Sequence, residues 1–328
     1  MDDVARQAIA TATGVLAAVY IALSMGLAEP YWAALSVMII ANTDRDALFT
    51  KGVLRIAGTL VGVTGGYYLA QWLEGHAIQQ VAIVALAAAI GTYGRQRSAY
   101  GYAWFYGALT FMLVILYTMV EPQNLYQFAR YRCYEILIGV VCGTLASWAL
   151  GPRAGELHAH IVAQQATSTP ENAMRQSLIA ALGAFTIMII WAIYDLPQLP
   201  QVLISSLIII DSDPLATRHR GAQRIFGCII GGIAGLIVIG LDATNPIWWS
   251  VALFLGVFSF ARLHLAKSPH AYIGTQAAIA YLVTLVGAGP PTTLSPPIDR
   301  LVGIVIGVTI MTVLVWAFNA GRPAPKPA

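Results

Sequence analysis

The chain contains 328 residues, of which 58% are hydrophobic and only 10% are charged. Soluble domains average about 45–50% apolar and about 25% charged residues, so these charges are too few to cover a water-facing surface, and a soluble globular protein is excluded. The formal net charge of +3 is small and gives no support to nucleic-acid binding.

Apolar stretches account for most of the chain. A helix that crosses the roughly 30 Å hydrocarbon core of a bilayer needs about 20 residues. The stretches lie at about residues 8–28, 31–42, 52–73, 77–94, 98–120, 131–150, 176–194, 198–210, 221–241, 246–261, 270–288 and 299–318. The first lacks a small-residue cleavage site, which favours a retained helix over a removed signal peptide. We therefore predict an all-α integral membrane protein with about twelve transmembrane helices.

A polar stretch separates the sixth apolar segment from the seventh and divides the chain in two. It contains Arg153, Glu156, two histidines and a run rich in Ser, Thr and Gln. We predict three parts: a first six-helix transmembrane repeat at residues 1–150, a cytoplasmic linker at residues 151–174, and a second six-helix repeat with a short cytoplasmic tail at residues 175–328.

Lysine and arginine fix the orientation, because the cytoplasmic loops of membrane proteins collect positive charge. With the N-terminus in the cytoplasm, all but three of the 18 Lys and Arg residues fall on the cytoplasmic side, and the three others are Arg130, Arg132 and Arg300. We therefore expect both termini to be cytoplasmic.

The two halves repeat each other. A shift of 169 positions without a gap brings polar and glycine residues into register, and further along the chain the shift becomes 168. The matched pairs include Arg6 with Arg175, Lys51 with Arg220, Gly52 with Gly221, Arg55 with Arg224, Gly62 with Gly231, and Arg132 with Arg300. Each copy holds an even number of helices, so the two repeats must run parallel.

A weaker pattern lies inside each copy. Four arginines are each followed by glycine seven residues later, namely Arg55 by Gly62, Arg132 by Gly139, Arg224 by Gly231 and Arg300 by Gly307. Such a pattern is compatible with an inverted three-helix repeat nested in each half, as in many secondary transporters. The alternative is the high frequency of glycine in membrane helices.

The four repeated arginines are expected at helix N-termini, where the helix dipole disfavours a cation by about 0.3–1 kcal/mol. For Arg55 and Arg224 the positive-inside rule is a sufficient explanation. Arg132 and Arg300 face the other side, so each needs a partner, either a passing anion or a neighbouring carboxylate such as Glu135 or Asp299. Glu135 is the acid that lies deepest in an apolar segment, and its functional interpretation is proton coupling.

Segments 31–42 and 198–210 are too short to cross a bilayer and occupy equivalent positions in the two halves, which points to a transporter's binding site. Acidic and amide residues follow them: Asn42, Asp44, Asp46, Asp211 and Asp213. We expect these to serve as gates or as helix-end partners of Lys51, Arg55, Arg220 and Arg224, and simple loop solvation is the alternative.

The stretch from Pro30 to Gly66 carries an aromatic pair, Tyr31-Trp32, and the motif Arg55-x-x-Gly58-Thr59-x-x-Gly62. It resembles the signature region of the fusaric acid resistance and aromatic acid exporter family. The resemblance implies export of small aromatic carboxylates across a bacterial inner membrane. The second copy has Pro200-Gln201 in place of the aromatic pair, and the linker stands where large family members carry a cytoplasmic domain.

On this interpretation the substrate is bound by one set of polar and aromatic residues: Arg55, Arg132, Arg224, Arg300, Tyr31, Trp32 and Asn42. A second set provides coupling and gating: Glu135, Asp44, Asp211, Asp213, Lys51 and Arg220. The expected partners are the organic anion and membrane lipid, and a homo-oligomer or a periplasmic adaptor subunit stays open.

Two other functions fit the same features. One is a passive anion channel, to which the plant malate channels are distantly similar, and the other is a non-transporting scaffold for envelope assembly. We expect no enzyme, cofactor or metal, and none of the six histidines has metal-site spacing. No Walker lysine loop occurs, so ATP-driven transport would need a separate subunit. The three cysteines fall in apolar stretches and are expected to be small core residues.

Overall fold

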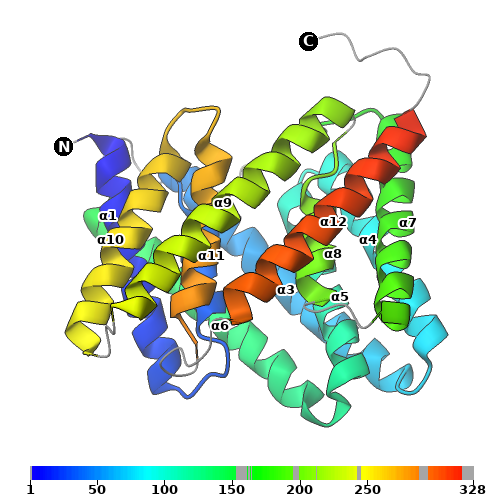
Figure 1. Cartoon of the computed structure of the whole chain (residues 1–328), viewed down its shortest axis with the longest axis horizontal. Helices are drawn as coiled ribbons and strands as arrows, with labels where there is room; N and C mark the ends of the chain where they lie inside the picture. Colours follow the sequence, from blue (N-terminus) through cyan, green and yellow to red (C-terminus); the bar gives the residue numbers. More distant parts are fainter. Residues whose placement is uncertain are drawn as a thin grey trace. The chain divides into compact units, whose positions relative to one another are not determined.

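The computed structural model describes residues 2–152, 161, 163, 165–194, 199–211, 213–241, 245–287 and 295–319. These residues form twelve α-helices and one short 3₁₀ helix, η1, and contain no strand (Figure 1). The helices are α1 (Asp3–Ser24), α2 (Tyr31–Ile40), α3 (Arg45–Trp72), α4 (Ala77–Arg97), α5 (Gly101–Val120), η1 (Pro122–Asn124), α6 (Leu125–Leu150), α7 (Pro170–Tyr194), α8 (Leu199–Ile208), α9 (Pro214–Gly240), α10 (Pro246–Leu265), α11 (Ala271–Leu285) and α12 (Ser295–Asn319). Parts of the expected linker and the expected C-terminal tail lie outside the described residues.

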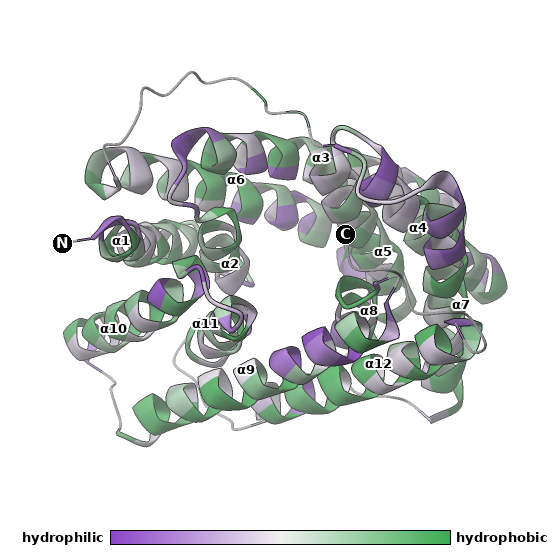
Figure 2. Ribbon diagram, turned by 90° about the horizontal axis from the view of Figure 1, so that it is seen from above, coloured by the Kyte–Doolittle hydropathy of each residue, from purple (hydrophilic) through white to green (hydrophobic). Residues whose placement is uncertain are grey.

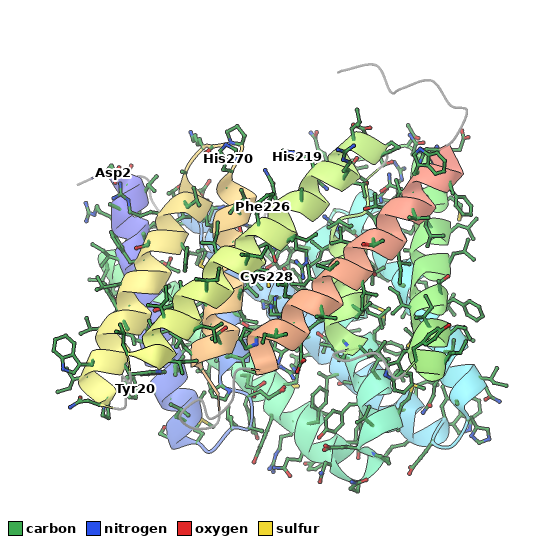
Figure 3. The ribbon with its side chains drawn as sticks, viewed as in Figure 1. Asp2, Tyr20, His219, Phe226, Cys228 and His270 are labelled. Atoms are coloured by element: carbon green, nitrogen blue, oxygen red, sulfur yellow. The ribbon has the colours of Figure 1, made fainter. Side chains whose placement is uncertain are left out.

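Nine of the described helices are long and apolar enough to cross a membrane, and α2, α8 and α11 are shorter apolar helices. Long hydrophobic stretches cover α9, α10 and α12 (Figure 2). Large apolar side chains point outward from them: Phe226 of α9, labelled in Figure 3, is 60% exposed and Trp248 of α10 is 68% exposed. Exposed apolar side chains on long apolar helices are typical of a surface that faces lipid. The prediction of an all-α, multi-pass membrane protein is therefore confirmed.

Several helices begin earlier than the apolar stretches indicate. We expected starts at residues 52, 131 and 221, whereas α3, α6 and α9 begin at Arg45, Leu125 and Pro214. Those boundaries were wrong because charged or amide residues in the first two turns of each helix, such as Arg45 in α3, Gln127 in α6 and Arg218 in α9, lower the local hydropathy. α3 and α9 are capped by carboxylates, as Asp44 accepts hydrogen bonds from backbone N–H groups of the first turn of α3 and Asp213 does so at α9.

The helices group into two compact units, and each unit combines pieces of both halves of the sequence. Unit 1 consists of residues 1–56, 130–162 and 223–298. In this unit α1 packs against α2 and α10, α10 packs against α11, and α11 packs against α2. Figure 2 shows the ends of these four helices together. The two shorter helices α2 and α11 are therefore neighbours inside unit 1.

Unit 2 consists of residues 57–129, 163–222 and 299–328. Here α4 packs against α7 and α5, and α7 packs against the short helix α8. The contacts have the same pattern as in unit 1, since a shift of 169 positions converts α1 and α2 into α7 and α8. The long helices α3, α6 and α9 contribute residues to both units.

Glycines allow the short helices to lie directly on the long ones. In unit 1 a side chain at Gly139 of α6 would collide with the carbonyl oxygen of Ala33 in α2, and in unit 2 a side chain at Gly307 of α12 would collide with the carbonyl oxygen of Val202 in α8. Both backbones therefore approach more closely than any residue with a Cβ permits. Each short helix is thus held against a long helix that carries a repeated arginine.

Candidate functional site

The four repeated arginines lie inside helices and are buried. Arg55 is ten residues beyond the start of α3, and Arg224 is ten residues beyond the start of α9. At about 1.5 Å per residue this places each roughly 15 Å along its helix. Their exposed fractions are 2% for Arg55, 3% for Arg132, 1% for Arg224 and 4% for Arg300.

The expectation that these arginines sit at helix N-termini is therefore wrong. The unpaired N–H groups that give a helix its positive end belong to its first four residues, and Arg132 and Arg300 lie seven and five residues beyond the starts of α6 and α12. The dipole argument does not apply to them. Burial is the relevant cost, because a guanidinium removed from water must be compensated by charge or hydrogen bonds.

Arg132 is compensated by two carboxylates and one aromatic ring, all within unit 1. Its Nη2 lies 2.6 Å from Oε2 of Glu29, and its Nη1 lies 3.2 Å from Oε2 of Glu135. The guanidinium carbon lies 4.1 Å from the centroid of the Trp32 ring, within the range of a cation–π contact. The expected pairing of Arg132 with Glu135 is thus observed, and Glu29 is a partner that the sequence analysis missed.

Glu29 lies in the turn between α1 and α2. α1 ends in a left-handed turn at Gly26, whose φ of 65° favours glycine. The chain then reverses, and the Glu29 carboxylate accepts hydrogen bonds from the Tyr31 hydroxyl at 2.7 Å and from the Trp32 Nε1–H at 3.1 Å. The Glu29 backbone N–H donates to Oε1 of Glu135 at 3.2 Å. Tyr31 and Trp32, predicted from the family motif, therefore join the Arg132 cluster.

Arg55 lies beside the next turn of α2. Its Nε donates to the Ser36 hydroxyl at 3.2 Å, and that hydroxyl donates to the Trp32 carbonyl at 2.8 Å. Trp32 and Ser36 are four residues apart and share one face of the helix. This face of α2 therefore carries contacts to two buried arginines about one helical turn apart, Arg132 at its start and Arg55 further along.

The other shorter helix of unit 1 contacts a third arginine. Arg224 of α9 donates through Nη1 to Oε1 of Gln276 at 2.7 Å and lies 3.5 Å from the Tyr272 hydroxyl. Both partners belong to α11, which packs against α2. Unit 1 therefore brings Arg55, Arg132 and Arg224 onto two adjacent short helices.

In unit 2, Arg300 of α12 donates through Nη1 to Oε1 of Gln201 in α8 at 2.7 Å. Gln201 stands 169 positions after Trp32, so the arginine and the short helix meet at corresponding places in both units, through an amide in one case and an indole in the other. A hydrogen bond to a neutral amide leaves the positive charge of Arg300 formally uncompensated by that partner.

The acidic and amide residues at the ends of the short helices have local roles. Asn42 accepts a hydrogen bond from the Asp44 backbone N–H at 2.9 Å, and Asp211 accepts one from the Asp213 backbone N–H at 3.2 Å. Asp211 also forms an ion pair of 3.1 Å with Arg220. Of the expected gating contacts, the structure thus shows the pair in unit 2, while Asp44 and Asp213 serve as the helix caps described above.

Lys51 lies on α3, one turn before Arg55, and is partly buried. The buried arginines also contact four residues to which the sequence analysis gave no binding role, namely Glu29, Ser36, Gln201 and Gln276. Two of them carried a partial signal, since Glu29 directly precedes the Pro30-Tyr31-Trp32 motif and Gln201 stands 169 positions after Trp32, but neither signal identifies the contact with an arginine. Among the described residues no group of three or more His, Cys, Asp or Glu side chains could hold a metal ion.

Comparison with known proteins gives two overlapping family matches. The model of the fusaric acid resistance protein family matches residues 5–189, and a model described as fusaric acid resistance protein-like matches residues 184–315. The chain is similar to the p-hydroxybenzoic acid efflux pump subunit AaeB of Escherichia coli O1:K1 / APEC and of Shigella boydii serotype 18, each 28% identical over 176 residues. These matches cover 48% of the chain and 27% of each relative, so the chain spans about a quarter of their length. No solved structure matches.

Proposed function

Because the chain belongs to the fusaric acid resistance protein family, we propose that it is a secondary transporter that exports small organic anions, and aromatic carboxylates in particular, across the bacterial inner membrane. The observation that carries this proposal is the buried Arg132, which already holds two carboxylate groups and lies over the ring of Trp32, next to Tyr31. The family name and the p-hydroxybenzoic acid pump subunits among its relatives support an aromatic acid as the substrate.

Recognition follows from the chemistry of the α2 face. A guanidinium binds a carboxylate through charge-assisted hydrogen bonds, and the rings of Tyr31 and Trp32 offer surfaces on which an aromatic acid can stack. Ser36 lies one turn further along α2 and accepts a hydrogen bond from Arg55 of α3, so an anion that leaves Arg132 has a second cation about one helical turn away. Arg224 of α9 and Arg300 of α12 are assigned equivalent binding roles through their contacts with α11 and α8, and Asn42, which follows α2, is assigned to the inner end of the proposed path.

The proposed topology has twelve membrane helices in two parallel six-helix repeats, at residues 1–150 and 175–328, joined by a cytoplasmic linker at residues 151–174. The recurrence of the α6–α2 glycine contact at α12 and α8 supports the repeat. An inverted three-helix repeat nested within each copy fits the recurring Arg and Gly spacing. The distribution of Lys and Arg supports cytoplasmic termini. Within unit 1, Asp2 and His270 lie at one end and Tyr20 at the other (Figure 3), as this topology requires.

The inner ends of the short helices are the proposed gates. In unit 2 the ion pair between Asp211 and Arg220 links the chain after α8 to α9. In unit 1 the corresponding residues are Asn42 and Lys51. Asp44 and Asp213 contribute by fixing where α3 and α9 begin, so a movement of either long helix is transmitted to the end of the neighbouring short helix.

Proton coupling is assigned to Glu135. Its side chain is 1% exposed and faces Arg132, Glu29 and the Glu29 backbone N–H. Protonation of Glu135 removes one of the two negative charges that hold Arg132, which increases the attraction of Arg132 for an incoming anion. A pH gradient across the membrane can thereby change the affinity of Arg132 for the anion.

The decisive experiment is flux of 4-hydroxybenzoate in proteoliposomes, with and without an imposed pH gradient, against protein-free liposomes. A secondary transporter accumulates the anion when the gradient is imposed, whereas a passive channel only equilibrates it. Absence of any protein-dependent flux, together with an unchanged cell phenotype after alanine substitution of the four arginines, would leave the scaffold function instead. A partner subunit, as the word "subunit" in the relatives' names suggests, would appear as flux that requires its addition.

A further inference from the structure

Three hydrogen-bond donors converge on one carboxylate at the start of α2. The Glu29 side chain accepts from Nη2 of Arg132 at 2.6 Å, from the Tyr31 hydroxyl at 2.7 Å and from Nε1–H of Trp32 at 3.1 Å. A cation, a phenol and an indole around one carboxylate are the donor set expected of a binding site for a free carboxylic acid. In this structure the carboxylate belongs to the protein itself.

The occupant and the site differ in their exposure. The Glu29 side chain is 40% exposed and belongs to a turn, whereas the Arg132 side chain is 3% exposed and belongs to α6. Water can therefore hydrate the Glu29 carboxylate when it leaves the ion pair. The buried Arg132 guanidinium cannot be hydrated in the same way. The carboxylate is therefore the member of this ion pair that water can solvate when the pair separates.

We propose that Glu29 is a built-in occupant of a carboxylate-binding site formed by Arg132, Tyr31 and Trp32, and that a substrate carboxylate binds by exchanging with it. The inference rests on the proposed function for the identity of the substrate, but the site itself does not depend on it. One carboxylate replaces another, so the charge around Arg132 is the same before and after exchange.

Exchange has a consequence for affinity and for the start of α2. The substrate must compete with a carboxylate that is covalently attached and therefore present at high effective concentration. Removing the Glu29 carboxylate should then tighten the binding of any carboxylate that fits. Release of the Glu29 side chain also removes one of the contacts between α6 and the turn that precedes α2, while the Glu29 N–H can still donate to Glu135.

The test uses two substitutions of the occupant and one matched control in purified full-length protein. Glu29→Ala empties the site, and Glu29→Gln leaves a neutral amide of the same size that competes less well. The control is Glu121→Ala, since Glu121 is also an exposed carboxylate that accepts a hydrogen bond from a tyrosine, Tyr117, at 2.8 Å but belongs to unit 2. The probes are acetate and benzoate, with chloride and benzamide as the matched ion and the neutral isostere.

We expect acetate to raise the melting temperature of Glu29→Ala by several degrees more than chloride does, and to have no such effect on the wild type or on Glu121→Ala. We expect benzoate, but not benzamide, to bind Glu29→Gln at least about fivefold more tightly than it binds the wild type in calorimetric titration. If Glu29→Ala does not fold, the Glu29→Gln titration decides alone.

The outcomes separate this inference from the proposed function. Wild-type protein that transports 4-hydroxybenzoate, combined with no gain in carboxylate binding in either Glu29 variant, would overturn the exchange and leave export standing. A gain for acetate in Glu29→Ala without transport of any aromatic acid would establish the site and remove aromatic export. Equal gains in Glu29→Ala and Glu121→Ala would show a general charge effect and would also overturn the exchange.

Discussion

The Nη2 atom of Arg132 and the Oε2 atom of Glu29 lie 2.6 Å apart, although 103 positions separate the two residues in the sequence. This contact joins the first half of α6 to the turn before α2, and it does so beside a second carboxylate, Glu135, at 3.2 Å. The short helix therefore begins where a buried cation holds it. A change in the group that Arg132 binds therefore changes the contacts at the start of α2.

Substitution of Arg132 tests the energetic weight of this cluster. Arg132→Gln leaves Glu135 buried without its ion pair, and removing one partner of a buried pair costs about 3–5 kcal/mol. Arg130→Gln is the control, because Arg130 lies on the same helix but is exposed, and its guanidinium lies over the Tyr131 ring, a contact worth about 0.5–1 kcal/mol at an exposed site. In thermal unfolding in mixed micelles, Arg132→Gln should lower the melting temperature much more than Arg130→Gln does.

Addition of Glu135→Gln to Arg132→Gln should recover part of that loss, since the double variant no longer buries a lone carboxylate. Equal falls for Arg130→Gln and Arg132→Gln would show that the cluster carries no more stability than a surface contact.

Hydropathy was sufficient to locate every helix, because a bilayer requires long apolar runs and the short runs at α2 and α8 remain visible against them. The burial of the four arginines was not predictable in this way. The polar turns from Arg45 to Lys51 extend α3 backward, so Arg55 moves from the predicted helix start to a position about 15 Å inside it. A residue's depth in the membrane depends on where its helix begins, and capping decides that as much as hydropathy does.

The partners of the arginines depend on contacts that are distant in sequence. Glu135 was predictable for Arg132 because three residues along a helix is one turn. Glu29 and Gln276 were not, since only the packing of α2 on α6 and of α11 on α9 brings them within reach. The internal repeat offered one route to such pairs, because Trp32 and Gln201 stand at matching positions and contact matching arginines.

Neutralising Glu135 tests the coupling role. Glu135→Gln keeps the size of the side chain and its ability to accept the Glu29 N–H, but it no longer changes charge with pH. We expect protein-dependent flux of 4-hydroxybenzoate to persist and its response to an imposed pH gradient to disappear. Glu121→Gln, at an exposed carboxylate outside the site, should respond to the gradient as the wild type does. Full pH dependence in Glu135→Gln would reduce Glu135 to an ion-pair partner.

The role of Asp44 is separable into a cap and a charge. Its Oδ1 accepts hydrogen bonds from the Asp46 N–H at 2.9 Å and the Ala47 N–H at 3.2 Å. Asp44→Ala removes the cap and should lower stability by about 1 kcal/mol, whereas Asp44→Asn keeps an N-cap residue and should be close to neutral. Unfolding in mixed micelles measures both. If Asp44→Asn retains stability but loses flux, the charge itself acts in the gate.

The glycines of α3 can be tested as a matched pair three residues apart. A methyl group at Gly62 would collide with the carbonyl oxygen of Gly107 in α5, and a backbone atom cannot rotate aside. At Gly65 the nearest atoms are ring carbons of Phe111 at 3.7 Å, an ordinary contact. Gly62→Ala should therefore lower the free energy of unfolding by about 1–3 kcal/mol, while Gly65→Ala should leave it unchanged or raise it by up to about 1 kcal/mol through helix propensity.

Reversible unfolding in mixed micelles measures the free energy of unfolding of both variants. The two substitutions lie in one helix and one unit, so their opposite expected effects can be compared directly. A loss of similar size in both variants would mean that α3 resists any added side chain. A tolerated Gly62→Ala would mean that α3 and α5 can separate at little cost, and the close backbone contact would then be no constraint on the movement of α3, the helix that carries Arg55.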